Sequence, residues 1–204
     1  MSHNSESPRS AIAASSRRWA SRDRPILAYG FMLFAAVILV LNYFIKFPTL
    51  PEEAAANFHA FRDKKLELQI ETADAMKLER FVVTEGVPFV VRSLDGATYT
   101  LKGGRIQRLR NRKSCWTVYQ GPENKLFVFQ MYPGNIGELP AATEIRRDRA
   151  LSFNIYAREG TTAVFWQEGD HCCVLVSDTS SEEVVRLASA SADSQSGDGR
   201  TSPP

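Results

Sequence analysis

The sequence predicts an α+β protein: a single transmembrane helix followed by helices, an antiparallel β-sheet and a C-terminal capping helix. Three observations lead to this fold class. Residues 26–45 are apolar and carry no charge, and the later part of the chain alternates short β-like runs with turn signals. A helix signal beginning at Ser180 then follows the last of these runs.

The composition limits the class of protein. The 204 residues suffice for one domain with additions, and the formal net charge is only +2. A surface that binds nucleic acid normally needs a clear basic excess. We therefore expect no nucleic-acid partner, and nothing in the composition points to a small-molecule substrate.

The run ILAYGFMLFAAVILVLNYFI at 26–45 predicts a membrane-spanning helix. A helix rises about 1.5 Å per residue, so a run of this length crosses a hydrocarbon core of roughly 30 Å. A helix buried in a soluble core is seldom apolar on every face over such a length. Because the run is too long for a cleaved signal peptide, we interpret it as a signal anchor.

The flanking charges predict the orientation of this helix. Five arginines precede it, whereas Lys46 and then the acidic pair Glu52 and Glu53 follow it. The positive-inside rule places the N-terminus in the cytoplasm and the chain after Lys46 outside. The expected location is the inner (cytoplasmic) membrane, with a disordered cytoplasmic arm at 1–25 and a disordered tail at 191–204, both poor in apolar residues.

A membrane-proximal helical segment is expected at 46–86. Pro51 opens a helix-favouring stretch that reaches Ile70, with acids in its first turn and bases later. Thr72 is the expected N-cap of a second helix over 73–85, which Gly86 and Pro88 end.

An extracytoplasmic α+β domain is expected at 87–190. Short runs rich in Val, Phe, Tyr, Thr and Trp predict its strands at 89–92, 98–101, 105–108, 114–119, 126–132, 151–157, 161–167 and 172–177. Turn signals separate them at 102–104, 121–124, 158–160 and 168–170. Such short turns join antiparallel neighbours. Residues 133–149 are expected to form an irregular insertion, and 180–190 the closing helix.

Cysteine is the residue type that leaves alternatives open. Cys115 lies in one expected strand. Cys172 and Cys173 are adjacent in another, and His171 directly precedes them. Neighbouring strand residues face opposite sides, so Cys172 and Cys173 cannot both hold one ligand. Cys115 could form a disulfide with Cys172 or Cys173 in an oxidising compartment. The thiols could instead be buried small hydrophobes, or join His171 and Met131 in a metal- or redox-handling site.

The remaining candidate residues favour structural roles. The aromatic residues of the strands are expected in the core: Trp116, Phe127, Phe129, Tyr132, Phe153, Tyr156, Phe165 and Trp166. A basic run at 105–113 is expected as a solvated rim that could touch anionic headgroups if it faces the membrane. The arginines at 146, 147 and 149 are expected as loop charges. No nucleophile elbow, phosphate loop or zinc helix is present, so we expect no enzyme and no cofactor.

The order of several short motifs resembles the extracytoplasmic domain of membrane-bound anti-sigma factors, the transmembrane transcriptional regulators of bacteria. The matching stretches are YTLKGGRI at 99–106, CWTVY at 115–119, KLFVF at 125–129, TAVFW at 162–166, CVLVSD at 173–178 and EEVVRLA at 182–188. Trp166 to Gly169 fits the family's W-x-x-G turn, and Ser177 to Ala188 fits its terminal helix. The resemblance covers about Glu52 to Ala190, and implies a hairpin at the L-x-G-G-R motif.

The chain departs from that family before the membrane span. Family members that restrain a sigma factor carry a cytoplasmic helical domain, often with a zinc motif, whereas residues 1–25 hold no cysteine and only His3. The resemblance therefore implies a sensor or binding domain that acts through protein partners, among them a sigma factor. The alternatives are an accessory or assembly factor of a membrane complex, and a periplasmic metal- or redox-handling protein that uses Cys115, His171, Cys172 and Cys173.

Overall fold

The computed structural model of the chain describes residues 31–37, 48–87, 91–92, 94 and 98–196, with side chains as far as 192. The chain divides into two compact units, Met1–Phe47 and Pro48–Pro204. Each unit is described by itself.

The first unit contains a helix at 31–37. Its large apolar side chains are exposed, with 76% of the surface of Phe31, 74% of Met32 and 70% of Leu33 accessible. The rest of the predicted span at 26–45, and the predicted arm at 1–25, lie outside the described residues. Within the described part of the chain, no helix is long and apolar enough to cross a membrane.

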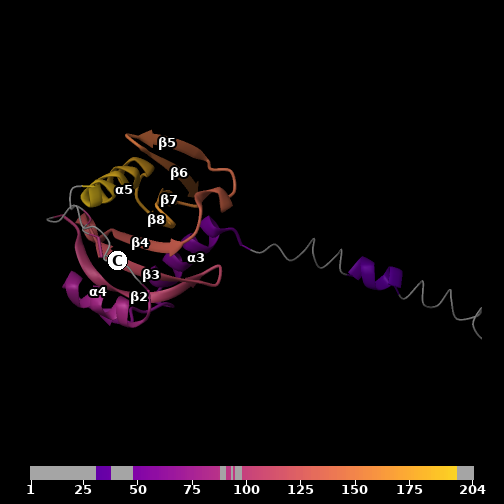
Figure 1. The fold of residues 1–204 in the computed structure, drawn as a ribbon, viewed down its shortest axis with the longest axis horizontal. Helices are drawn as coiled ribbons and strands as arrows, with labels where there is room; N and C mark the ends of the chain where they lie inside the picture. The colour runs from indigo at the N-terminus through magenta and orange to yellow at the C-terminus, as the bar shows by residue number, and fades with distance from the viewer. Residues whose placement is uncertain (1–30, 38–47, 88–90, 93, 95–97, 197–204) are drawn as a thin grey trace, which may run out of the picture. The chain divides into compact units, whose positions relative to one another are not determined.

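The second unit confirms the α+β class, because an eight-stranded antiparallel sheet carries helices on its two faces (Figure 1). The helices are α3 (Leu50–Arg62), α4 (Ala75–Thr84) and α5 (Ser181–Ser196), with short 3-10 turns η1 (Pro122–Asn124) and η2 (Ile136–Glu138). The strands are β1 (Ile70–Glu71), β2 (Thr100–Leu109), β3 (Arg112–Gln120), β4 (Leu126–Pro133), β5 (Glu144–Asp148), β6 (Leu151–Arg158), β7 (Thr161–Glu168) and β8 (His171–Ser177).

The sheet consists of two four-stranded meanders that meet in its centre. The strand order is β1-β2-β3-β4-β8-β7-β6-β5, so the two meanders join through β4 and β8. In that antiparallel pair Phe127 lies opposite Ser177 and Met131 lies opposite Cys173. The two edge strands are β1 and β5.

Both faces of the sheet are buried, each under different helices. On one face, α4 and α5 contribute residues such as Leu78 and Leu187 to a core that includes Phe129 and Trp166. On the other face, α3 inserts Leu50, Ala54 and Phe58 into a second core. The expected aromatic core is confirmed for all eight side chains except Tyr156, which is only half-buried.

Helix α3 is shorter than the sequence indicates. It begins after Thr49, whose backbone N–H donates to the Glu52 carboxylate at 2.8 Å in a capping box. It ends at Arg62, because Lys64 adopts a left-handed conformation with φ of 58°. The chain then extends so that Ile70 and Glu71 form β1, where we expected helix.

The stretch after β1 also differs from the prediction. Asp74, not Thr72, is the N-cap of α4, accepting hydrogen bonds from two backbone N–H groups. The Thr72 hydroxyl instead accepts from the Asp74 backbone N–H at 3.1 Å. In the expected strand at 89–92, the described residues 91 and 92 belong to no strand, and 89–90 lie outside the described residues.

The expected turn at 102–104 is wrong, because β2 runs through it as one strand from Thr100 to Leu109 with a bulge between Leu101 and Gly103. The two-residue turn of this hairpin is formed by Arg110 and Asn111, with φ of 44° and 65°. Gly103 has φ of 143°, and an added Cβ would lie 2.0 Å from the Ile70 carbonyl oxygen. The glycine pair therefore allows β1 to approach; it does not reverse the chain.

Two further segments, the expected insertion at 133–149 and the closing helix, also differ from the prediction. The expected irregular insertion at 133–149 contains η2 and the edge strand β5. The closing helix does not end at 190 but continues to Ser196, so the first six residues of the expected tail are helical. Ser191 and Ala192 are buried at 1% and 6% exposure, which explains why the helix continues. Residues 197–204 lie outside the described residues.

Candidate functional site

The three cysteines form neither of the disulfides that the sequence left possible, Cys115 with Cys172 or with Cys173. All are free and fully buried. Along the sheet, Cys115 of β3 lies opposite Met131 of β4, which lies opposite Cys173 of β8. Strands are spaced by about 4.8 Å, so Cys115 and Cys173 are about 10 Å apart, beyond the roughly 7 Å between Cα atoms that a disulfide tolerates. Cys172 belongs to the core on the opposite face.

The same geometry separates the residues of the suggested metal or redox site. Cys115 and Cys173 lie in the α4/α5 core, whereas Cys172 lies in the α3 core. Burial raises the pKa of the Cys172 thiol to about 11, and it raises the pKa values of the other two thiols as well. His171 is half-buried at the start of β8. Within the described ranges, no three His, Cys, Asp or Glu side chains gather around a common point.

A buried ion pair that the sequence did not indicate lies in the α4/α5 core. The Arg92 guanidinium donates to Glu168 with both terminal nitrogens, one of them at 2.7 Å, and also lies over the Phe129 ring. The indole N–H of Trp166 donates to the same carboxylate, and the Tyr119 hydroxyl donates to the Arg92 carbonyl. These contacts fix the segment before β2 to the sheet.

Several charged side chains lie around the first turn of α3. The Glu52 carboxylate accepts from Thr49 and pairs with Arg158 of β6 at 2.8 Å. The hydrogen bonds from Thr49, followed by the charge of Arg158, lower the pKa of Glu52. Next to it, the Glu53 carboxylate accepts from the backbone N–H of Arg110 at 3.2 Å. The turn of the β2–β3 hairpin is thereby held against the first turn of α3.

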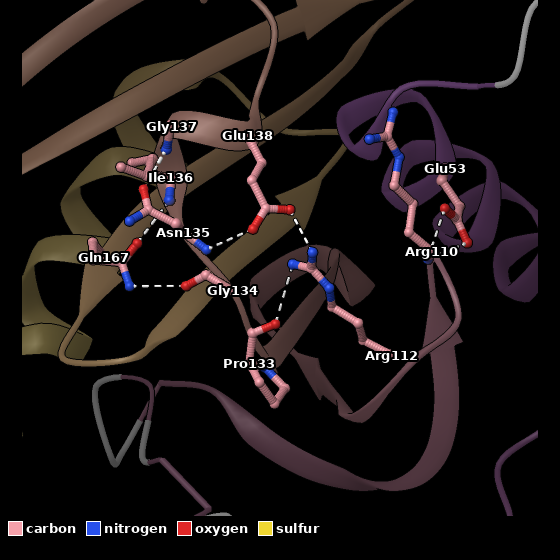
Figure 2. A network of polar contacts seen from close by, with 10 residues as sticks. All are labelled: Glu53, Arg110, Arg112, Pro133, Gly134, Asn135, Ile136, Gly137, Glu138 and Gln167. Carbon is pink, nitrogen blue, oxygen red and sulfur yellow. Dashed lines mark hydrogen bonds and ion pairs between the residues drawn. The ribbon is translucent and has the colours of Figure 1, made fainter.

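Arg112 and Glu138 extend this arrangement to η2, as Figure 2 shows. Arg112 donates to Glu138 at 2.5 Å and to the Pro133 carbonyl at 3.2 Å. The hydrogen bond from Arg112 lowers the pKa of Glu138 and raises that of Arg112. Glu138 also accepts from the Asn135 backbone N–H, within a capping box that closes η2.

The η2 loop is in turn fixed to the sheet by a side chain of β7. The Gln167 side-chain oxygen accepts from the Ile136 backbone N–H at 2.7 Å, and its amide nitrogen donates to the Gly134 carbonyl at 3.0 Å (Figure 2). Strand β7, the η2 loop and the hairpin turn are therefore joined in one polar network. We call the hairpin turn and its flanks, residues 108–113, the basic tip.

A groove of about 200 Å³ is lined in part by residues of the same helical turn. Pro51 and Ala55 of α3 line one wall, and Tyr156 and Ala163 of the sheet line the other. The Glu52–Arg158 ion pair lies at this groove. The arrangement offers a small apolar surface with a charged border, which suits contact with a protein side chain.

The basic run at 105–113 does not form one continuous rim. Arg105 donates to the Glu67 carbonyl, and Lys113 donates to the Glu85 carbonyl. Arg112 is neutralised by Glu138. Of the arginines expected as loop charges, Arg146 lies in β5 and pairs with Glu144 and Glu182. The charged residues are visible in the sequence, whereas their partners are brought to them by the fold.

Comparison of the chain with protein-family models, with curated proteins and with solved structures gave no match.

Proposed function

We propose that this chain is a single-pass inner-membrane protein, anchored through residues 26–45, whose folded unit lies outside the cytoplasm and acts by binding protein partners. Its role would be regulatory or sensory, and not enzymatic. The observation that carries the anchor is the helix at 31–37, whose large apolar side chains are exposed in the middle of an uncharged run.

Exposed apolar helix surface of this kind is costly in water. Phe34 and Val37 expose 63% and 46% of their surface, in addition to the three preceding large side chains. Burying such a side chain gains about 1.5–3 kcal/mol. A lipid bilayer supplies that burial along the whole apolar run.

The folded unit supports a binding role through the surface around α3. The helices bury both faces of the sheet, so the accessible features are loops, edges and grooves. Charged side chains gather at the first turn of α3, beside the groove between α3 and the sheet. This surface is held by two capping boxes and by the Arg112–Glu138 ion pair, and a pre-organised surface binds at a lower entropic cost.

The resemblance to anti-sigma factors makes a sigma factor the specific partner to test. Residues 1–25 would reach it from the cytoplasmic side and would order on binding. The alternative partner is a membrane complex that this chain helps to assemble, to which the span and the arginine-rich arm would dock.

Topology is tested first, by thiol labelling in intact cells. The three native thiols are fully buried, so an introduced cysteine reports its own location. Lys64→Cys lies at an exposed position of the folded unit, and Ser10→Cys lies in the arm. A membrane-impermeant maleimide should label Lys64→Cys in intact cells and Ser10→Cys only after lysis. Labelling of both, or of neither, would contradict the proposed orientation.

The partner is tested by purifying the full-length chain from mildly solubilised membranes. Recovery of a sigma factor, lost on deletion of residues 2–24, would support the regulatory form of the proposal. A variant with the arginines at 9, 17 and 18 changed to lysine keeps the charge, and serves as the control for that deletion. Recovery of integral membrane subunits without a sigma factor would favour the assembly factor.

A further inference from the structure

We infer that the basic tip docks on anionic phospholipid headgroups of the membrane that holds the anchor. This inference rests on the proposed function, and deepens it by giving the folded unit a second attachment to the bilayer. The ligand is the phosphate-bearing headgroup of a lipid such as phosphatidylglycerol, at the outer surface of the membrane.

The position of the tip is fixed by the Glu53 carboxylate. It accepts from the Arg110 backbone N–H at 3.2 Å and 3.3 Å through its two oxygens. Glu53 lies in the first turn of α3, and Figure 2 shows Arg110 beside that helix. The tip cannot move away from α3 without breaking this contact.

The covalent chain limits the distance between that turn and the proposed anchor. Only residues 46–49 separate the predicted end of the span at Ile45 from the start of α3 at Leu50. A fully extended chain spans at most about 3.6 Å per residue, which gives about 18 Å between Ile45 and Leu50. The headgroup region occupies several of these ångströms. The basic tip is therefore within reach of the headgroups.

The charges of the tip are unequal, and two of them are left for an external partner. Arg112 is neutralised by Glu138. Among the described residues, the Arg108 guanidinium donates hydrogen bonds to the oxygens of Asn111 alone, which are neutral, at 2.6 Å and 3.1 Å. The side chain of Arg110 forms no ion pair within the described part of the chain, and its charge contributes only a minor part of the lowering of the Glu138 pKa. Both arginines are exposed.

The turn at the tip is tight, and it holds the side chain of one of these two arginines. Arg110 and Asn111 both have positive φ, which defines a tight two-residue turn between β2 and β3. Asn111 accepts from Arg108 through its backbone and side-chain oxygens, so the Arg108 side chain is held across the turn. The held Arg108 guanidinium and the exposed Arg110 side chain next to it in the turn suit phosphate oxygens, which arginine binds in a bidentate manner.

The test uses the full-length chain reconstituted in vesicles of phosphatidylcholine alone, or with about a third phosphatidylglycerol, a fraction sufficient for a strongly negative surface potential. Lys113→Cys, labelled with an environment-sensitive fluorophore, places the probe on β3 directly opposite Arg108. The native thiols are fully buried and do not compete for the label. We expect a blue shift and higher emission with phosphatidylglycerol, reversed by high salt, which screens exposed charges.

The matched variants assign this effect to the tip. Each arginine near an anionic surface changes the equilibrium constant for docking by about fivefold, so Arg108→Gln with Arg110→Gln should lower that constant about 25-fold and abolish the lipid-dependent shift. Arg146→Gln with Arg147→Gln removes the same charge from β5 and should leave it unchanged. Equal emission in the two lipid mixtures would overturn the inference, as would a shift that survives the Arg108/Arg110 double change. If the tip binds an acidic protein instead of lipid, the emission would be equal in the two lipid mixtures.

A separate measurement tests the membrane anchor independently of the docking of the tip. Each reconstituted sample is washed with alkaline carbonate and floated on a density gradient before the fluorescence is read. A chain that does not float with the vesicles has no membrane span, which refutes the anchor itself. A chain that floats but shows no dependence on phosphatidylglycerol retains the anchor and refutes only the docking.

Discussion

Arg92 and Glu168 form a buried ion pair across 76 positions of the chain. The Arg92 side chain is 1% exposed and the Glu168 side chain 17%, and the Trp166 indole donates to the same carboxylate. The pair also reaches α5, since Arg92 donates to the Ser191 carbonyl at 3.4 Å. One guanidinium therefore connects the segment before β2, the end of β7 and the last turns of α5.

Removing the charge of Glu168 should destabilise the folded unit strongly. Glu168→Gln leaves the Arg92 cation buried without a counter-ion, which typically costs about 3–5 kcal/mol. Urea unfolding of residues 48–204, followed by tryptophan fluorescence, measures this loss. Glu144→Gln breaks the exposed Arg146 pair instead and should cost far less, because solvent screens an ion pair at the surface. Equal effects of the two changes would show that the buried pair is dispensable.

The three thiols should be unreactive while the protein is folded. Burial raises their pKa values, to about 11 for Cys172, so little thiolate forms at mildly alkaline pH. We expect a thiol reagent to react with none of them in native protein, and with all three after unfolding without a reductant. Lys64→Cys provides the reactive control. Fewer than three free thiols in the unfolded, unreduced protein would restore the disulfide prediction.

Substitution of Gly103 should release the edge strand β1. An alanine Cβ there would lie 2.0 Å from the Ile70 carbonyl oxygen, at a φ of 143° that favours glycine. We expect Gly103→Ala to cost about 3 kcal/mol, combining backbone strain and overpacking.

Gly160→Ala is the matched control for that substitution. Gly160 also has positive φ, 74°, but an added Cβ meets no atom within 4 Å. It should cost only about 1 kcal/mol. Amide hydrogen exchange should show faster exchange at residues 70–71 in Gly103→Ala alone. Unchanged protection there would contradict the bulge as the place where β1 attaches.

The Arg112–Glu138 pair should add an acid-dependent contribution to stability. The folded state lowers the Glu138 pKa below its ordinary value of 4.5, chiefly through the hydrogen bond from Arg112. The contribution is therefore present above pH 4.5 and is lost as the pH falls through the lowered pKa. Glu138→Gln should flatten the dependence of the urea midpoint on pH in this acidic range.

A double-mutant cycle separates this ion pair from other acidic groups. Arg112→Gln should flatten the same acidic region as Glu138→Gln, and the double variant should add no further change. Additive effects of the two changes would show that the carboxylate titrates independently of Arg112.

Local patterns predicted most of the strands and the presence of α3, α4 and α5, although the boundaries of all three helices differ from the expected ones. The runs that became β3, β4, β6, β7 and β8 are rich in β-branched and aromatic residues, and the tight turns between them carry their own signals. The Gly103–Gly104 pair misled the prediction, because the close approach that requires glycine comes from β1, which is distant in sequence. Helix α5 passed its expected end because Ser191 and Ala192 are buried against the fold.

The functional surface was less predictable, for a related reason. The sequence shows Arg110 and Arg112 as equal members of one basic run. Only the fold brings Glu138 to Arg112 while Glu53 receives the backbone of Arg110. Nothing in the sequence indicated that Arg92 is buried in an ion pair, because its partner Glu168 lies 76 positions later, at the end of β7. An ion pair such as Arg92–Glu168 joins residues that are far apart in the sequence. Neither the composition nor the spacing of charges along the chain indicates which charges are paired.

The junction between β4 and β8 in the centre of the sheet also affects the order in which the protein folds. Each meander pairs strands that are neighbours along the chain, so its hairpins can form early and locally. The junction between β4 and β8 joins residues as far apart as Phe127 and Ser177, and its loop-closure entropy delays it. The two meanders should therefore form separately and pair with each other late in folding. The Arg92–Glu168 contact should form in that final step. A chain emerging from the ribosome would complete its first meander well before the strands of the second have been synthesised.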